Sequence, residues 1–481
     1  MQRIITMLFT RKLFITILIF IIVLILFGAI LNSHYHGSLR FQFLQKIAVF
    51  TSEIPKNIKF IFLNKAITGD VVLPINEIIY NDRKFFNKKI NSVSNHEELI
   101  IISRHDPNIN RSIVEIRDLN TFQILHSYLP DIESIYQKID FSKSEFKNLK
   151  KNLGYNRFTM WHPKILLNGD LIFQSESPLV KVDYDGKIIW VNDNDIYHHS
   201  INLDLDGNIY VPSFMQPYSK KVSKFIGKES DTPDNNFFND DAINILDKDG
   251  EIIFSKSITE ILIENNQGHR VLSQSTLIVD PIHLNDIEPV LKNGPYFKTG
   301  DVFLSLRNLS VVLLYRPETN KIIKVIEGAF FNQHDVDILD EKTISIYNNN
   351  VTFTYPKNPN FILDTRRKVN ENNEIVIYDF ETDSFSKKFI DTFKKYKIDT
   401  DTHGLIDYLN DGSAIVEDSN NGRIFYLNKN GEVIWIFNNL SSKKQIYKLW
   451  WSRIISAKKS IELKKLINNK NLKRKSVNNT K

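Results

Sequence analysis

Five of the twelve histidines in this chain of 481 residues stand at the same place in a repeated pattern. They are His162, His199, His283, His334 and His403. Imidazole changes its protonation near pH 7, and at that pH it can act as a nucleophile, a general acid or a general base. The pattern therefore indicates one shared chemical site. The alternative is a structural histidine that recurs in every repeat.

Two other polar residues stand close to these histidines in the pattern. Asn285 comes two residues after His283, and in a strand this spacing places both side chains on one face. Arg307 interrupts the otherwise apolar strand sequence FLSLRNLS, where a buried guanidinium needs an anionic partner. That partner is either an anionic ligand or a nearby acid such as Asp286 or Glu288.

The segments that carry the histidines predict β-hairpins. Each begins with the histidine, continues as an alternating apolar run and ends in a second strand, and three of the five turn at Asn-Gly or Asp-Gly. The clearest turns are Asn168-Gly169, Asp206-Gly207 and Asp411-Gly412, and the segment from His283 needs a longer turn. A second hairpin usually follows, which gives four strands per unit, as in the blade of a β-propeller.

A further unit from Glu98 has the hairpin spacing but lacks the leading histidine. We therefore predict an all-β fold, a six-bladed β-propeller. Equivalent residues of the blades are related by rotation about the central channel, so the five histidines should converge on one axial pocket. A short basic helix is expected in the C-terminal tail, near residues 445–467, and another helix at 132–153.

An uncharged run from Leu13 to Leu31 is long enough to cross a bilayer as a helix. Arg3, Arg11 and Lys12 precede it without any acid, which predicts a cytoplasmic N-terminus. We expect a single-pass signal-anchor in the inner membrane, with the propeller in the periplasm; a cleaved signal peptide is the alternative. The chain has no cysteine, so no disulfide can support the exported domain.

Charge separates the middle of the chain from its two ends. Basic residues dominate the first 40 residues and the tail, whereas acids outnumber bases between them, which argues against nucleic acid as a partner. The basic tail either contacts anionic lipid headgroups or forms a solvated or self-docked helix. The expected parts are a cytoplasmic N-terminus (1–12), a transmembrane helix (13–31), a juxtamembrane adaptor (32–95), the propeller (96–440) and a basic tail (441–481).

The order and phase of these motifs resemble those of bacterial arylsulfate sulfotransferases over about residues 155–440. The pieces that carry the resemblance are HHSINLDLDGNIYV, HLND with GDVFLSLRNLSVVLLY, FFNQHDVDIL with ISIYNNN, and THGLIDYLNDGSAIVEDSNNGRIFYLNKNGEVIWIF. That family comprises periplasmic six-bladed propellers that move a sulfuryl group from a phenolic sulfate to a phenol without a nucleotide donor. Inserts at 214–240 and 356–372 depart from the pattern and leave the identity of the substrates open.

The resemblance implies a role for each matching residue. His334 would be the transient sulfuryl acceptor, and His199, His283, Asn285 and Arg307 would surround the sulfate. Thr402 and His403 would line the same channel, and His162 is assigned to substrate binding with them. Neither a metal nor another cofactor is expected.

Two other classes compete with this hypothesis. Three imidazoles at an axis could bind Zn or Cu, but no carboxylate consistently accompanies them, and Arg307 would repel a cation. A non-catalytic envelope propeller could serve as a binding or scaffold module. Such a scaffold would need neither Arg307 nor Asn285 in phase with the histidines.

Overall fold

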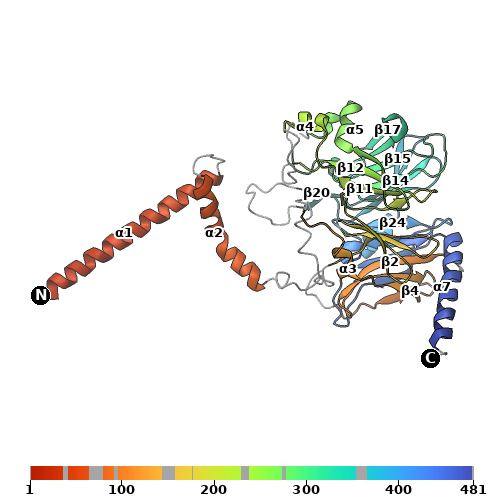
Figure 1. Ribbon diagram of the computed structural model, residues 1–481, viewed down its shortest axis with the longest axis horizontal. Helices are drawn as coiled ribbons and strands as arrows, with labels where there is room; N and C mark the ends of the chain where they lie inside the picture. The colour runs from red at the N-terminus through yellow and green to blue at the C-terminus, as the bar shows by residue number, and fades with distance from the viewer. Residues whose placement is uncertain are drawn as a thin grey trace. The chain divides into compact units, whose positions relative to one another are not determined.

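The computed structural model (Figure 1) describes residues 2–35, 42–63, 80–90, 96–142, 158–175, 177–228, 238–272, 278–353 and 366–478. The chain divides into two compact units, Met1–Asp70 and Val71–Lys481.

The N-terminal unit consists of two helices, α1 (Gln2–Tyr35) and α2 (Gln42–Leu63). Within α1 the stretch Arg11–Ser33 is apolar and long enough to cross a membrane, and it includes the predicted span. A signal sequence has the same features, so this helix fits either an anchor or a signal peptide. Gln45 of α2 donates a hydrogen bond to the hydroxyl of Ser33, at 2.8 Å.

The second unit is a six-bladed β-propeller, which confirms the predicted fold class. Each blade is a four-stranded antiparallel sheet in which each strand pairs with the next. Blade 1 is β28 (Arg453–Ile455), β2 (Leu99–Asp106), β3 (Arg111–Asp118) and β4 (Ile124–Tyr128). Blade 2 is β5 (Trp161–Ile165), β6 (Leu171–Gln174), β7 (Leu179–Val182) and β8 (Ile188–Asn192). Blade 3 is β10 (Asn202–Leu203), β11 (Ile209–Phe214), β12 (Asp241–Leu246) and β13 (Ile252–Ser257).

The remaining blades follow in chain order. Blade 4 is β14 (Leu284–Pro289), β15 (Val302–Leu306), β16 (Val311–Arg316) and β17 (Lys321–Glu327). Blade 5 is β18 (Val336–Ile338), β19 (Thr343–Asn348), β22 (Glu374–Asp379) and β23 (Ser384–Lys388). Blade 6 is β24 (Leu405–Tyr408), β25 (Ala414–Asp418), β26 (Arg423–Leu427) and β27 (Val433–Asn438).

Two short strands extend blade sheets: β1 (Phe86–Lys88) pairs at the edge of blade 6, and β9 (Ile196–Tyr197) pairs with β11. Strands β20 (Val351–Phe353) and β21 (Arg366–Lys368) form a separate two-stranded sheet. The connections carry short helices, namely α3 (Ile132–Tyr136), α4 (Lys220–Ile226), α5 (Ile258–Glu264), α6 (Ile390–Tyr396), η3 (Gly268–Arg270), η5 (Arg307–Leu309), η6 (Pro317–Thr319) and η7 (Ser419–Asn421). The helix expected at 132–153 begins where α3 does but is five residues long, and 143–153 lies outside the described residues.

The predicted hairpin turns join the first two strands of their blades. Gly169, Gly207 and Gly412 all have a positive φ, near +85°, which explains why the turn sequence requires glycine at these positions. Alternating side chains then pack between neighbouring blades in separate apolar clusters, of which the one around Ile287, Leu304 and Leu313 is an example.

Blade 1 is closed by a strand from the far end of the propeller sequence. Strand β28 pairs with β2, with Leu99 opposite Ile455, so the sheet topology carries the propeller beyond residue 440. This explains why the unit that begins at Glu98 has no leading histidine motif of its own. Pairing the first and last segments removes two exposed sheet edges.

The C-terminal helix α7 (Ala457–Asn478) begins directly after this closing strand. It lies along blade 1 near β4 (Figure 1) and buries Leu463 and Ile467 in the apolar cluster of blades 1 and 2. Lys464 forms ion pairs with Glu97 and Asp118. Of the two alternatives for the basic tail, the structure shows a helix that is docked on the propeller.

Candidate functional site

All five predicted histidines gather at one end of the central channel. The ring centroids of His199 and His283 are 4.8 Å apart, those of His199 and His334 are 6.5 Å apart, and those of His334 and His403 are 6.2 Å apart. Trp451 completes the group, because its ring lies 4.4 Å from His403 and 4.0 Å from His162. Each blade therefore contributes one aromatic ring, and blade 1 contributes a tryptophan.

The backbone reason for this convergence is a left-handed residue at the entrance to the first strand. His162, His199, His283, His403 and Trp451 have φ values of 45°, 54°, 57°, 70° and 63°. In blade 5 the left-handed residue is Asn332 (φ 50°), two positions before His334. A non-glycine residue in this region costs about 1–3 kcal/mol and persists only where its surroundings impose it. Sequence reasoning missed Trp451, although Trp-Trp-Ser leads into Arg-Ile-Ile of β28 much as Thr-His-Gly leads into Leu-Ile of β24.

His334 is buried and bonded at both ring nitrogens. Its Nδ1 lies 2.7 Å from Oδ1 of Asn349, and its Nε2 accepts a hydrogen bond of 3.0 Å from the backbone N–H of His403. Burial, together with the positive charge of Arg307, holds the pKa of His334 well below its ordinary value. The ring is therefore neutral near pH 7, as a nucleophile requires.

The segment Thr400–Gly404, which we call the strap, carries two of the predicted site residues. The backbone N–H and the hydroxyl of Thr402 are hydrogen-bonded to Oδ1 of Asn420, at 2.9 and 3.2 Å. Gly404 has a φ of +92°, and a Cβ at this position would lie 2.5 Å from the ring of Tyr347. The strap therefore fits closely against blade 5 and presents the N–H of His403 to His334.

His283 has an acidic partner. Its Nδ1 lies 2.6 Å from Oδ2 of Asp280, so the carboxylate accepts the ring proton. Burial alone would raise the pKa of Asp280, but the neighbouring His283 and Arg307 outweigh burial and lower it. A carboxylate of this kind orients an imidazole and stabilises its protonated form. Asp280 was not predicted, although it stands three residues before His283.

Arg307 is buried directly beside these groups. It follows β15 as the first residue of η5 rather than lying within the strand, and its backbone N–H donates to the carbonyl of His283, at 3.1 Å. Its Nη1 donates to Oδ1 of Asn308, at 3.3 Å. Its positive charge contributes to the lowered pKa of Asp280.

His199 and Asn285 line a small cavity at the centre of the group. Nδ1 of His199 lies 2.8 Å from Nδ1 of His198, so one ring donates a proton to the other. Burial lowers the pKa of His198, a residue that was not predicted, to about 3. Asn285 donates from Nδ2 to the carbonyl of Gln333, at 2.9 Å. His162, His334 and Trp451 also line this cavity, whereas His283, His403, Thr402 and Arg307 lie outside its wall.

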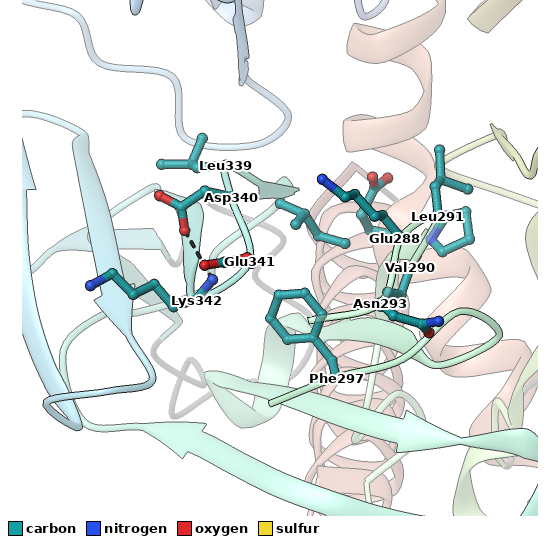
Figure 2. A pocket seen from close by; sticks show the side chains of 12 residues that line it. Glu288, Val290, Leu291, Asn293, Phe297, Leu339, Asp340, Glu341 and Lys342 are labelled. Atoms are coloured by element: carbon teal, nitrogen blue, oxygen red, sulfur yellow. Dashed lines mark hydrogen bonds between the residues drawn. The ribbon is translucent and has the colours of Figure 1, made fainter. Parts of the chain in front are cut away.

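The cavity at the histidines is nearly closed. Its volume of about 10 Å³ matches the space that a single water molecule needs. A much larger cavity of about 580 Å³ lies where the first strands of blades 4 and 5 end (Figure 2). Figure 2 shows Glu288 to Asn293 on one side of it and Leu339 to Lys342 on the other. None of the histidines lines that cavity, so we place the candidate site at the smaller one, where the reactive groups are.

Charged residues form a second layer of the channel, next to the histidines. Arg453 of β28 donates to Asp335 at 3.0 Å, and the backbone N–H of Ile406 donates to the other oxygen of Asp335 at 3.2 Å. Asp335 is thus a partner of neighbouring strands and not of the His334 ring. In the same manner Asp286 accepts from Val336 N, and Asp407 accepts from Ile454 N.

The charges of this second layer perturb one another. Burial raises the pKa of Asp286 to about 6, and the nearby Asp335 adds to this rise. Burial also raises the pKa of Glu288 to about 8, with Asp286 as the next cause, and lowers that of Lys164 to about 8. Within the ranges that the structure describes, no three His, Cys, Asp or Glu residues are grouped so that they could hold a metal ion.

Fold and site together define a six-bladed propeller whose axial site is lined by histidines. The family model described as "Arylsulfotransferase (ASST)" matches residues 162–439, which is more than half of the chain. The protein therefore belongs to the arylsulfotransferase family, as the resemblance of its motifs predicts.

Other comparisons add little to this assignment. A protein of unknown function from Bacteroides caccae is 11% identical with a TM-score of 0.45, over 74% of this chain and 98% of that one. Virginiamycin B lyase from Staphylococcus aureus is 13% identical with a TM-score of 0.31, over 57% of this chain and 69% of that one. Similarity at this level carries no functional argument. No curated protein matches the sequence significantly.

Proposed function

We propose that this protein transfers a sulfuryl group from a phenolic sulfate ester to a phenol through a sulfohistidine at His334, without a nucleotide donor. Its membership of the arylsulfotransferase family supports the reaction class. The observation that carries the assignment is the state of His334, a buried neutral imidazole at the centre of a group of potential acids and bases.

The proposed reaction has two halves. In the first, Nε2 of His334 forms a bond to sulfur while the bond from sulfur to the phenolic oxygen breaks. The departing oxygen takes a proton from an imidazole, a role that suits His283 because the carboxylate of Asp280 holds its Nδ1 proton and orients the ring. In the second half the acceptor phenol gives its proton to the same imidazole, its oxygen bonds to sulfur, and the bond between nitrogen and sulfur breaks.

The other site residues serve to bind the substrates in this proposal. Arg307 provides positive charge for the sulfuryl oxygens, and His199 is a second imidazole for proton transfer or electrostatic support. Asn285 and His162 would contact the bound ester. Thr402 and His403 lie on the strap, which must move before an aryl sulfate can enter, because the present cavity holds about one water molecule.

The test is an assay of the full chain in detergent with a chromogenic aryl sulfate and an excess of a second phenol. We expect release of the coloured phenol and an equal amount of the sulfated acceptor, identified by mass spectrometry. If neither product forms, the proposal fails in favour of a non-catalytic binding module. The closed cavity and the occupied Nε2 of His334 are the observations that favour this second candidate.

Arg307→Lys should reduce transfer roughly 10²–10³-fold, because lysine keeps the charge but loses the planar donor geometry. The effect should appear in kcat rather than in the melting temperature. Arg316→Lys is the matched control, since Arg316 in the same blade is paired with Asp301 instead of facing the histidines. Equal activity of Arg307→Lys and the wild type would show that Arg307 has a structural role and does not bind the sulfuryl oxygens.

We further propose that the N-terminal helix is a signal-anchor and that the propeller faces the periplasm. Because the chain has no cysteine, a single Lys429→Cys substitution at an exposed position provides a unique label site. A membrane-impermeant maleimide should label it in intact spheroplasts, and the label should stay with the membrane fraction. Labelling that occurs only after lysis would contradict the orientation.

A further inference from the structure

We propose that Asn349 is the positioning residue that fixes the tautomer of His334 and thereby makes Nε2 the sulfuryl-accepting atom. This inference rests on the proposed function for its catalytic meaning, but the tautomer itself is a property of the resting protein. Asn349 follows β19 in the run Asn348-Asn349-Asn350 and is 1% exposed.

The orientation of the Asn349 amide follows from its partners. Its Nδ2 donates to the carbonyl oxygens of Thr400 and His403, at 2.9 and 2.8 Å. A flipped amide would direct its own oxygen at these two carbonyl oxygens, which offer no proton. The amide oxygen therefore faces His334, and since that oxygen can only accept, Nδ1 of His334 carries the proton.

A second contact leads independently to the same tautomer. The backbone N–H of His403 donates to Nε2 of His334, at 3.0 Å, and a donor of this kind can only meet a lone pair. A neutral imidazole has one N–H and one lone pair, so Nε2 is the nucleophilic nitrogen. The bond to sulfur must form at the lone pair that His403 N–H now occupies. Asn349 holds the carbonyl of the same residue, so one side chain controls both the ring and the strap.

The choice of an amide instead of a carboxylate has a chemical consequence. His283 has the carboxylate of Asp280 as its Nδ1 partner, which suits an imidazole that must gain and lose a proton. His334 has the neutral Asn349, which orients the ring and stabilises its protonated form less than a carboxylate would. When Nε2 bonds to sulfur and the ring becomes cationic, the amide oxygen still accepts the Nδ1 proton, so no second proton transfer is needed. The two partners thus separate the nucleophile from the acid–base residue.

The test replaces Asn349 in the full chain and follows covalent labelling of the protein by a chromogenic aryl sulfate alone, as a function of pH. In the wild type, the lowered pKa of His334 keeps the nucleophile unprotonated, so labelling should persist as the pH falls below 6.5. Asn349→Asp should raise this pKa, so that its labelling is lost at higher pH than in the wild type and recovers in alkali. Asn349→Ala should lower kcat roughly 10–100-fold at every pH with KM unchanged, the usual scale for losing a residue that orients another.

Asn348→Ser is the matched control, because Asn348, the last residue of β19, accepts from the backbone N–H of Phe331 and donates to the side chain of Asn350 rather than contacting the imidazole. Its pH profile should equal that of the wild type. The inference would be overturned if labelling of Asn349→Asp fell at the same acidic pH as labelling of the wild type. It would also be overturned if Asn348→Ser shifted the pH of this fall as much as Asn349→Asp does.

Activity is not needed to test the tautomer. NMR of the full chain labelled with ¹⁵N-histidine reports the tautomer, and the signals of His334 are those that disappear in His334→Asn. At pH 7 we expect Nδ1 of His334 to be protonated and Nε2 to be unprotonated. If the wild type forms no adduct but shows this tautomer, the proposed function fails while the positioning by Asn349 stands. A protonated Nε2 would overturn the positioning itself.

Discussion

Replacing His334 with asparagine should abolish sulfuryl transfer, with a loss of roughly 10⁴-fold or more in kcat, the scale observed when the nucleophile of a covalent mechanism is removed. Asparagine keeps a polar group near Asn349 but has no nitrogen lone pair that can bond to sulfur. Incubation of the wild type with donor alone should add one sulfuryl group to a peptide that contains His334, as measured by mass spectrometry. The same incubation should leave the variant unmodified.

His199→Asn and His283→Asn provide the comparison, because each removes one acid–base or electrostatic group and leaves the nucleophile. They should reduce transfer roughly 10²–10⁴-fold. The covalent mass on His334 should still form in both, more slowly. A sulfuryl group that maps instead to His199, His283 or His403 would refute His334 as the nucleophile while preserving the two-step route.

Arg453→Met should lower the free energy of unfolding by about 3–5 kcal/mol, the cost of removing one partner from a buried ion pair. Arg453 is buried between Asp335, Asp337 and Asp407, so its loss leaves several carboxylates near one another without a cation. Chemical denaturation of the full chain in detergent, followed by tryptophan fluorescence, measures this change. Lys459→Met is the control, because Lys459 is exposed in the helix that follows the same strand.

The destabilisation should depend on pH with a definite sign. Burial already raises the pKa of Asp337 and Asp407 above the ordinary value for aspartate, and removal of Arg453 raises both further. A carboxyl with a raised pKa in the folded state contributes stability at low pH and loses it as the pH rises through that pKa. The difference in the free energy of unfolding between Arg453→Met and the wild type should therefore be smallest near pH 5 and largest near pH 8. An equal loss at both values would show that packing, not charge, explains the role of Arg453.

The parts of this structure that follow from local patterns could be predicted from the sequence. Alternating runs around Asp206-Gly207 or Asp411-Gly412 specify hairpins within a few residues, and their constant phase placed the five histidines on one axis. Strand β28 gave no such signal, because its partner Leu99 lies at the opposite end of the propeller sequence from Ile455. Trp451 occupies the histidine position of blade 1, and it was not predicted for the same reason.

The contacts that tune the site were less accessible to sequence reasoning. Asn349 and Asp280 become partners of His334 and His283 only through the positions of loops, and carboxamides and carboxylates are common in turns for other reasons. The left-handed backbone at His199 or His403 is only weakly signalled by residue type, since glycine is the usual marker of this conformation and histidine, although enriched there, mostly adopts others. What the sequence predicted was the identity and grouping of the reactive side chains. It did not predict which imidazole has an amide and which a carboxylate for a partner.

The origin of strand β28 also bears on how the protein is made. A ribosome that has reached residue 440 has already synthesised every histidine of the axial site, yet Trp451 and Arg453 are still missing. At that stage blade 1 consists of three strands, and the edge of β2 that Ile455 will cover is open. The histidines of the axial site are therefore synthesised before the strand that closes the propeller around them. Strand β28 closes the propeller and brings Trp451 and Arg453 to the centre of the channel, so the axial site is complete only after this strand has been synthesised.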